Sequence, residues 1–337
     1  MSFKFSLSAV IALLVFSSPS FSAELNVYSA RKEALIKPLL DQFSEKTGVE
    51  VNLITGNADA LITRMQTEGQ FSPADVLITT DAGRLVRAKQ AEITQPLASS
   101  LAQSLIADNL RDADMHWIAL TKRARPMMFD PKKVDTSAIK SIFDLADARY
   151  RGQICVRSSS NIYNQSMVAA LLIEHDTETV EAWAKGIVDN MARAPKGGDR
   201  DQIKAVAAGQ CSIAIANTYY LAGMLTSADE NEREQARQVR VHWADSEAAT
   251  HINISGIAIA KHAPNVAHAQ ALIEFMLSAE SQRWYAQENN EYPVVKDVPW
   301  SELLMSFGEF NAQAVDLQQV GELNDDALRL MDRIGWK

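Results

Sequence analysis

Two adjacent tyrosines follow a short apolar run, and their position suggests a binding site for a cation. Tyr219 and Tyr220 come directly after the sequence SIAIA-Asn-Thr at 212–218. A free phenol has a pKa near ~10 and stays protonated at neutral pH, and two neighbouring phenolates repel each other. A hard trivalent cation such as ferric ion prefers oxygen ligands and makes their deprotonation favourable. The pair therefore indicates a ferric-type site, with simple aromatic packing as the alternative.

A serine-rich loop before an expected helix is a candidate anion site. Ser159, Ser160 and Asn161 precede a helical pattern that begins near Ile162. Ser and Asn commonly cap helices, and the free N–H groups of a helix N-terminus attract anions. A plain helix cap is the alternative. Tyr163 lies in the first turn of this helix, so we expect it beside an anion such as carbonate, which would fill coordination positions left open by the protein.

Basic residues follow two other expected strands. Arg31 comes after the first strand of the chain, and Arg123 lies in the run K-R-A-R at 122–125. Both are candidates for charge-assisted hydrogen bonds to the same anion. We expect the flanking Lys122 and Arg125 to be exposed to solvent or paired across a strand.

Other chemistry is missing from the sequence. It contains no G-x-S-x-G, H-E-x-x-H or phosphate-binding glycine loop, and its six histidines are scattered. The sequence therefore predicts a protein that is not an enzyme. A formal charge of −9, without a Lys/Arg cluster, argues against a nucleic-acid partner.

Strand and helix patterns alternate in two series, which predicts an α/β protein. The first series has expected strands at 25–29, 49–54 and 74–79, separated by helical patterns. This order favours a mainly parallel sheet covered by helices. The second series comprises strands at 154–158 and 212–217 and helices at 162–175 and 180–191. A further strand is expected at 256–261, followed by one long helix at 266–287.

The two series predict two lobes joined at a hinge. The apolar runs at 117–121 and 125–129 are candidates for a crossing between them. We expect lobe 1 to comprise 23–122 plus 250–305, and lobe 2 to comprise 123–249 plus 306–337. A chain of 337 residues is long enough for two such units. Ligands of α/β sheets bind beyond the carboxyl ends of strands, where the tyrosines and arginines described above are expected to meet.

The N-terminus carries the pattern of an export signal. Lys4 precedes an apolar run at 5–16, and small polar residues follow it. We expect a signal peptide at 1–22, cleaved near Ser22 and Ala23, and a periplasmic mature protein. In an oxidising compartment, Cys155 and Cys211 are expected to form one disulfide, with two buried thiols as the alternative.

Five motifs together resemble those of the periplasmic ferric-iron-binding proteins of ABC importers, over essentially the whole mature chain. They are Y-S-A-R-K-E (28–33), S-P-A-D-V (72–76), K-R-A-R (122–125), S-S-S-N-I-Y-N-Q (158–165) and N-T-Y-Y (217–220). The resemblance implies a two-lobe periplasmic binding protein type II fold with two crossing strands at the hinge. It also implies a monomer that delivers ferric iron to an inner-membrane ABC permease.

The resemblance further implies the roles of individual residues. Metal ligands would be Tyr163, Tyr219 and Tyr220; carbonate or bicarbonate would be held by Arg31, Arg123, Ser159, Ser160, Asn161 and Asn217. This sequence has Lys32, Glu33 and Thr80 where other members place ligands in the first lobe. The resemblance thus implies a first lobe without direct ligands. The alternatives are a binder of an oxyanion or a polyamine and, from another class, a periplasmic enzyme on the same fold.

Overall fold

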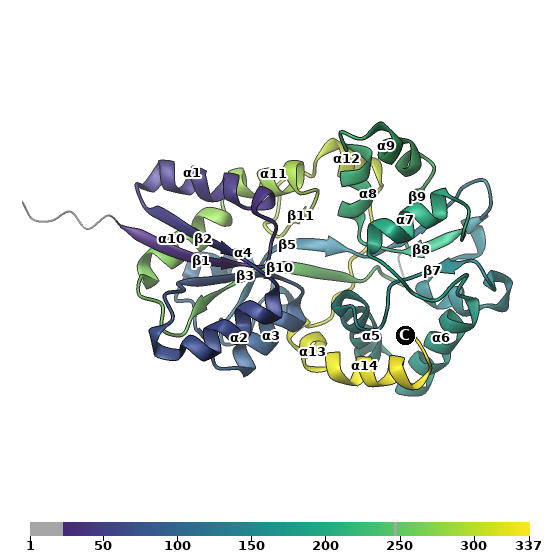
Figure 1. Cartoon of the computed structure of the whole chain (residues 1–337), viewed down its shortest axis with the longest axis horizontal. Coiled ribbons are helices and arrows are strands. Elements are labelled where there is room, and N and C mark those ends of the chain that lie inside the picture. Colours follow the sequence, from purple (N-terminus) through teal and green to yellow (C-terminus); the bar gives the residue numbers. More distant parts are fainter. Residues whose placement is uncertain (1–22, 246–247) are drawn as a thin grey trace, which may run out of the picture.

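The computed structural model describes residues 23–245 and 248–337, so the expected signal peptide at 1–22 lies outside the described residues. Two β-sheets, each flanked by helices, form the two halves of the molecule (Figure 1). The strand order of the larger sheet is β11-β5-β10-β3-β1-β2, with β4 paired to β10. The smaller sheet has the order β7-β8-β6-β9. The two-lobe α/β architecture is therefore as predicted.

The larger sheet is mixed. β1 runs parallel to β2 and β3, as the alternation of strands and helices predicts, whereas β10 runs antiparallel to β3, β4 and β5. Its strands are β1 (Glu24–Ser29), β2 (Glu50–Thr55), β3 (Val76–Thr80), β4 (Thr94–Gln95), β5 (Ile118–Ala124), β10 (Ile252–Ala260) and β11 (Tyr292–Pro293). The entire length of β10 is buried, which fits its mainly apolar sequence; its two polar residues, Asn253 and Ser255, are buried and hydrogen-bonded.

The smaller sheet combines both strand directions. β7 is parallel to β8, and β6 is antiparallel to β8 and β9. Its strands are β6 (Met127–Phe129), β7 (Ile154–Cys155), β8 (Ile213–Ile215) and β9 (Arg240–His242). β7 and β8 are shorter than the strands expected at 154–158 and 212–217. In both cases the remaining residues form the loop that precedes the next helix.

The chain crosses between the sheets through adjacent segments. β5 ends at Ala124, and β6 begins at Met127 in the other sheet, which confirms the predicted crossing. The return crossing precedes β10 and pairs with the first, since Ala124 is opposite Ile252 and the Arg125 N–H donates to the His251 carbonyl at 2.9 Å. These two segments, 124–127 and 250–252, form the hinge, as expected for a two-lobe clamp.

Helices cover both sheets, and one expected helix is divided. Ser278 accepts a hydrogen bond from the Ser281 N–H and caps a new helix, so the single helix expected at 266–287 is wrong. The helices are α1 (Lys37–Thr47), α2 (Ala58–Glu68), α3 (Ala82–Gln90), α4 (Ser100–Leu105), α5 (Ile162–Glu174), α6 (Thr177–Asn190), α7 (Asp199–Ala207), α8 (Thr218–Leu225), α9 (Glu230–Arg237), α10 (Val266–Met276), α11 (Ala279–Glu288), α12 (Glu302–Ser306), α13 (Leu317–Glu322) and α14 (Asn324–Arg333).

The C-terminal helices join the two halves. α13 packs against both α3 and α5, and α14 continues along α5 (Figure 1). At this junction, the Ser166 hydroxyl donates to the buried Asp81 carboxylate at 2.6 Å. Within the described parts of the chain, no helix is both long and apolar enough to cross a membrane.

Candidate metal centre

The three predicted tyrosine ligands lie at the starts of two helices in the half that contains the smaller sheet. Tyr163 is in the first turn of α5, and Tyr219 and Tyr220 are in the first turn of α8. The ring centroids of Tyr219 and Tyr220 are 4.3 Å apart. Asn161 and Asn217 occupy the N-cap positions, yet neither side chain caps its helix. The N–H groups at both helix starts therefore have no side-chain cap from these asparagines.

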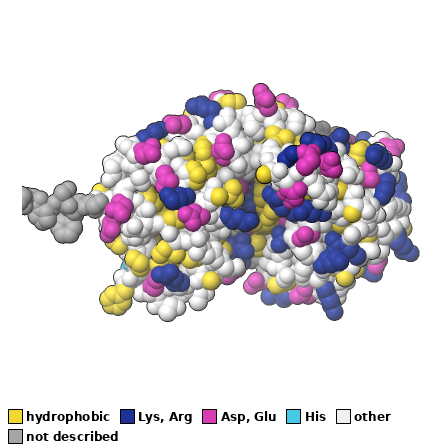
Figure 2. Space-filling model, turned by 45° about the horizontal axis from the view of Figure 1, so that its top comes forward, with side chains coloured by type: hydrophobic (Ala, Val, Ile, Leu, Met, Phe, Trp, Pro, Cys, Tyr) yellow, Lys and Arg dark blue, Asp and Glu magenta, His cyan; other side chains and the backbone are white. Residues whose placement is uncertain are grey.

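Arg123 brings the two helix starts together. It lies near the end of β5, is only 5% exposed, and its guanidinium carbon is 4.3 Å from the Tyr219 ring centroid and 5.0 Å from that of Tyr163. The guanidinium of Arg157 lies 5.6 Å from the Tyr163 ring. Contacts of this kind are attractive cation–π interactions. Figure 2 shows basic side chains beside the hollow between the two halves.

The environment of Tyr163 lowers the pKa of its phenol below the ordinary value. Burial by itself raises the pKa of Tyr163, but the positive charge of Arg123 and hydrogen bonds with Thr80, Arg123 and Tyr219 outweigh burial and lower the pKa to about 8. Thr80 ends β3 in the opposite half of the molecule. Tyr163 is therefore the phenol of the cluster that loses its proton most readily, and residues of both lobes lower its pKa.

The other two phenols remain protonated without a further cation. Burial, followed by the charges of Tyr163 and Asp199, raises the pKa of Tyr220 to about 12. Burial also raises the pKa of Tyr219 well above its ordinary value, although Arg123 acts in the opposite direction. Arg123 is a single charge and cannot stabilise three adjacent phenolates. Full ionisation of the cluster therefore requires a highly charged ion between the phenols.

A network of buried polar side chains connects Arg125 to the tyrosine pair. Arg125 donates to Asp199 at 2.7 Å, to Asn164 at 2.7 Å and to Asn217 at 3.1 Å. The Asn217 amide in turn donates to the Tyr219 hydroxyl at 3.3 Å. The expectation that Arg125 is exposed or paired across a strand is wrong, because it is 2% exposed and bound to Asp199 at the start of α7.

Asp199 is the functional residue that sequence reasoning missed. Its carboxylate is completely buried and binds both Arg125 and Arg157, the latter at 2.8 Å. In sequence it appears only as one acidic residue at the start of a helix, where Asp is common. No local signal identifies its two arginine partners, since they are 74 and 42 residues away.

Arg31 is bound to Glu291, the carboxylate that also lies near Arg123. Its guanidinium forms a two-pronged pair with Glu291, with N–O distances of 3.0 and 3.2 Å, and donates to Ser255 at 2.6 Å. The Glu291 carboxylate also lies 3.7 Å from Arg123 Nε. In this arrangement Arg31 is linked to the site through Glu291, and its predicted contact with an anion stays a prediction.

The serine loop lies directly before α5, but its hydroxyl groups have protein partners. Ser159 donates to Asp332 of α14 at 2.9 Å, and the hydroxyls of Ser158 and Ser160 are 2.9 Å apart. Anion binding by Ser159, Ser160 and Asn161 through their side chains thus stays a prediction.

The predicted disulfide is present. Cys155 at the end of β7 is bonded to Cys211, which lies just before β8, with a Cα–Cα distance of 6.0 Å. β7 leads into the loop before Tyr163, and β8 leads to Tyr219 and Tyr220. The disulfide therefore ties together the two strands that lead to the helix starts with the three phenols.

Comparison with known proteins shows which family the chain resembles. Residues 71–305 match the family described as bacterial extracellular solute-binding protein. Iron uptake protein A1 of Synechocystis is 41% identical, over 95% of this chain and 89% of that protein. The structure of Trichodesmium (IdiA) (FutA) in complex with iron and citrate ligands is 45% identical with a TM-score of 0.90, over 94% of this chain and all of that one. The ferric binding protein from Campylobacter jejuni is 36% identical with a TM-score of 0.88, over 93% and 100% of the two chains.

Proposed function

Because the chain belongs to the bacterial extracellular solute-binding proteins, we propose that it captures ferric iron in the periplasm and delivers it to an inner-membrane ABC permease. The observation that carries the proposal is the meeting of three phenols around Arg123. The relatives named above are called iron-uptake or ferric-binding proteins, which supports a transport role without a catalytic reaction.

In this proposal, Tyr163, Tyr219 and Tyr220 bind ferric iron as phenolates. Three phenolates balance the charge of a trivalent ion, so any anion that completes the coordination needs a further positive group nearby. Arg123 supplies that group, together with the N–H groups at the starts of α5 and α8. Carbonate or bicarbonate suits this position because it is small, planar and has several oxygen atoms for the metal and the guanidinium.

The contacts around the site argue against a polyamine as the ligand. Polyamine recognition requires carboxylates that are free to bind ammonium groups. Asp199 and Glu291 are each already paired with arginine, and the buried carboxylate of Asp81, which follows Thr80, accepts hydrogen bonds from Ser166 and Asn253. An oxyanion without iron would leave the phenols of Tyr219 and Tyr220 protonated and without a function.

Titration of the iron-free protein with ferric citrate, with and without bicarbonate, tests the proposal. We expect a visible absorption band from phenolate-to-iron charge transfer that saturates at one iron per protein and is stronger with bicarbonate. Tyr220→Phe should weaken and shift this band. Tyr150→Phe is the matched control, since Tyr150 is 6% exposed and the charged groups that act on it, Arg149, Asp144 and Asp147, are not part of the site. A protein that stays colourless would refute the iron assignment.

A further inference from the structure

One aspartate at the junction of the two halves has an unusual backbone and an unusual environment. Asp81 caps the start of α3, but its φ is 82° and its ψ is 127°, a conformation that residues other than glycine rarely adopt. Asp176 and Asp229, which cap α6 and α9, have φ values of −66° and −77° and are exposed, whereas Asp81 is completely buried. Helix capping alone therefore does not account for Asp81.

The Asp81 carboxylate is bound by uncharged donors from both halves of the molecule. It accepts hydrogen bonds from the Ser166 hydroxyl of α5 at 2.6 Å, from the Asn253 amide of β10 at 2.9 Å and from the Gly83 N–H at 3.0 Å. Burial of a carboxylate among uncharged donors is unfavourable. Because the same residue also carries backbone strain, the structure tolerates two costs at one position, which indicates a functional role.

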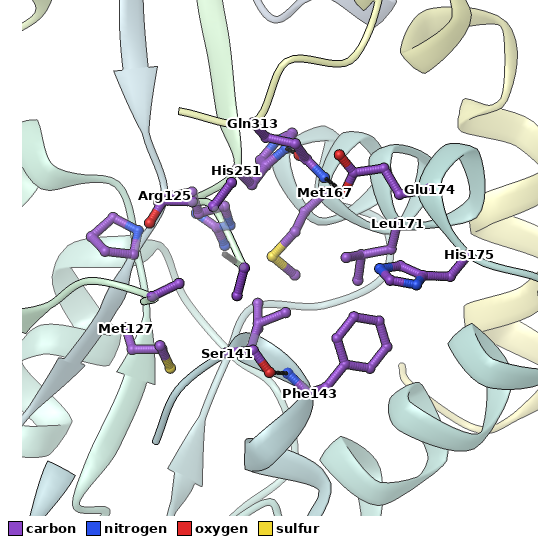
Figure 3. A pocket seen from close by; sticks show the side chains of 16 residues that line it. Arg125, Met127, Ser141, Phe143, Met167, Leu171, Glu174, His175, His251 and Gln313 are labelled. Atoms are coloured by element: carbon purple, nitrogen blue, oxygen red, sulfur yellow. Dashed lines mark hydrogen bonds between the residues drawn. The ribbon is translucent and has the colours of Figure 1, made fainter. Parts of the chain in front are cut away.

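Ser166 has a fixed orientation in this contact. Asn324 Nδ2 donates to Ser166 Oγ at 3.3 Å, which leaves the hydroxyl proton of Ser166 for Asp81. The other end of α5 is bound beside the hinge, where the Glu174 carboxylate accepts from the Gln313 amide at 2.6 Å (Figure 3). Ser166 therefore joins the N-terminal part of α5 to the connection between β3 and α3.

Two neighbouring contacts join the end of β3 to α5. Thr80 forms a hydrogen bond with Tyr163, and the next residue, Asp81, accepts from Ser166. Tyr163 and Ser166 are three residues apart on α5 and so lie on the same face of that helix. The contact of Asp81 involves an ionised group and is the stronger of the two.

We propose that Asp81 is a positioning residue of the iron site: its bond to Ser166 fixes the end of β3 on α5, so that the Thr80 hydroxyl meets the Tyr163 phenol. This inference rests on the proposed iron site, in which Tyr163 is a ligand. Asp81 acts through Thr80 and does not contact the ion.

A double-mutant cycle with Thr80 tests the proposal. Ser166→Ala removes the contact without changing the strained residue, and it should lower ferric-iron affinity about three- to tenfold in citrate competition. Asp81→Asn should have a similar effect, because its amide N–H groups would face donors. If the contact acts through Thr80, Ser166→Ala should cause no further loss in the Thr80→Val background, whereas independent contributions would multiply.

Ser281→Ala is the matched control for the cycle. The Ser281 hydroxyl is buried and donates to the Phe275 carbonyl within the larger half, so this variant should bind iron as wild type does. Independent, multiplying losses for Ser166→Ala and Thr80→Val would overturn the proposal, as would an unchanged affinity in Ser166→Ala.

The placement of Thr80 is also measured without iron. The NMR signal of the Tyr163 Cζ carbon, identified by its loss in Tyr163→Phe, reports the hydrogen bonding of this phenol at about pH 6, where tyrosines are protonated. Ser166→Ala should shift the signal in the same direction as Thr80→Val, and Ser281→Ala should not shift it. An unshifted signal in Ser166→Ala would overturn the proposal. Wild-type protein that binds no iron would refute the proposed function instead, and the Tyr163 signal would still decide the role of Asp81.

Discussion

Tyr28, beside the larger sheet, and Tyr163, at the start of α5, both have an arginine over the ring but differ in what surrounds that arginine. Arg64 lies 4.8 Å from the Tyr28 ring centroid and is bound to Glu68 at 2.6 Å. Glu68 also accepts from the Tyr28 hydroxyl at 3.1 Å, and burial together with this carboxylate raises the pKa of Tyr28. For Tyr163 the same kind of contact accompanies a lowered pKa.

The difference lies in how much of the arginine charge is available to the phenol. The Glu68 carboxylate neutralises Arg64 and accepts a hydrogen bond from the Tyr28 hydroxyl. Arg123, in contrast, is 3.7 Å from the carboxylate of Glu291 and faces two phenols. A buried tyrosine is therefore a structural residue unless an available positive charge offsets burial.

Replacement of a proposed metal ligand should cause the largest loss of iron affinity and so separate the two regions most clearly. We expect Tyr219→Phe to lower ferric-iron affinity by well over about 100-fold, more than the usual 10–100-fold effect of residues behind a metal ligand. Competition with citrate measures the affinity. Tyr28→Phe, in the other region, should leave the affinity within about twofold of wild type, as expected for a residue outside the site. Similar losses in both variants would erase the distinction between the two regions.

Removal of the central arginine should have the next largest effect. Arg123→Gln is expected to lower iron affinity about 10–100-fold and to weaken the dependence on bicarbonate. The pKa of Tyr163 should rise from about 8, because burial then acts without the opposing charge. A pH titration of phenolate ultraviolet absorbance follows that pKa. Arg64→Gln is the matched control and should bind iron as wild type does. A loss of iron affinity in Arg64→Gln would contradict the proposal that Arg123 acts directly on the iron site.

The three phenols should release their protons when iron binds. The pKa of Tyr163 is about 8 and that of Tyr220 about 12, both above 7, so both phenols are mainly protonated in iron-free protein at that pH. Tyr219 is protonated for the same reason. Iron affinity should therefore increase with pH, about tenfold per pH unit for each proton released. In weakly buffered solution at fixed bicarbonate, Tyr220→Phe should release about one proton fewer than wild type; an unchanged count would exclude Tyr220 as a phenolate ligand.

A contact from the opposite lobe should have the smallest effect. Thr80→Val removes a hydrogen bond that helps to lower the pKa of Tyr163, so this pKa should rise slightly and iron affinity should fall by less than about tenfold. Thr79→Val is a suitable control, because the Thr79 hydroxyl is buried and has no partner among the described residues. Equal changes in the two variants would show that Thr80 acts only through packing.

Much of the fold follows from local patterns in the sequence. The βαβαβ order, the crossing at 117–129 and the positions of the tyrosines at helix starts all depend on short-range periodicity and on the rule for strand ends. The division of the helix at Ser278 was missed because a serine inside an apolar helical pattern resembles an ordinary exposed position. Only the turn in the backbone makes it a cap.

The charge pairs behind the site could not be predicted in the same way. Arg31 and Glu291 are 260 residues apart, and the partners of Asp199 lie on different elements. Each residue taken alone resembles a surface charge. Their pairing results from tertiary packing, which a single sequence does not encode in any local spacing, and this is also why Arg125 was assigned incorrectly.

The Cys155–Cys211 bond has a consequence for repeated cycles of uptake. Since it joins the two strands that lead to the phenols, the mutual placement of these side chains is established once, when the protein folds and oxidises. In the proposed iron cycle, binding and release of the ion would then leave that placement intact.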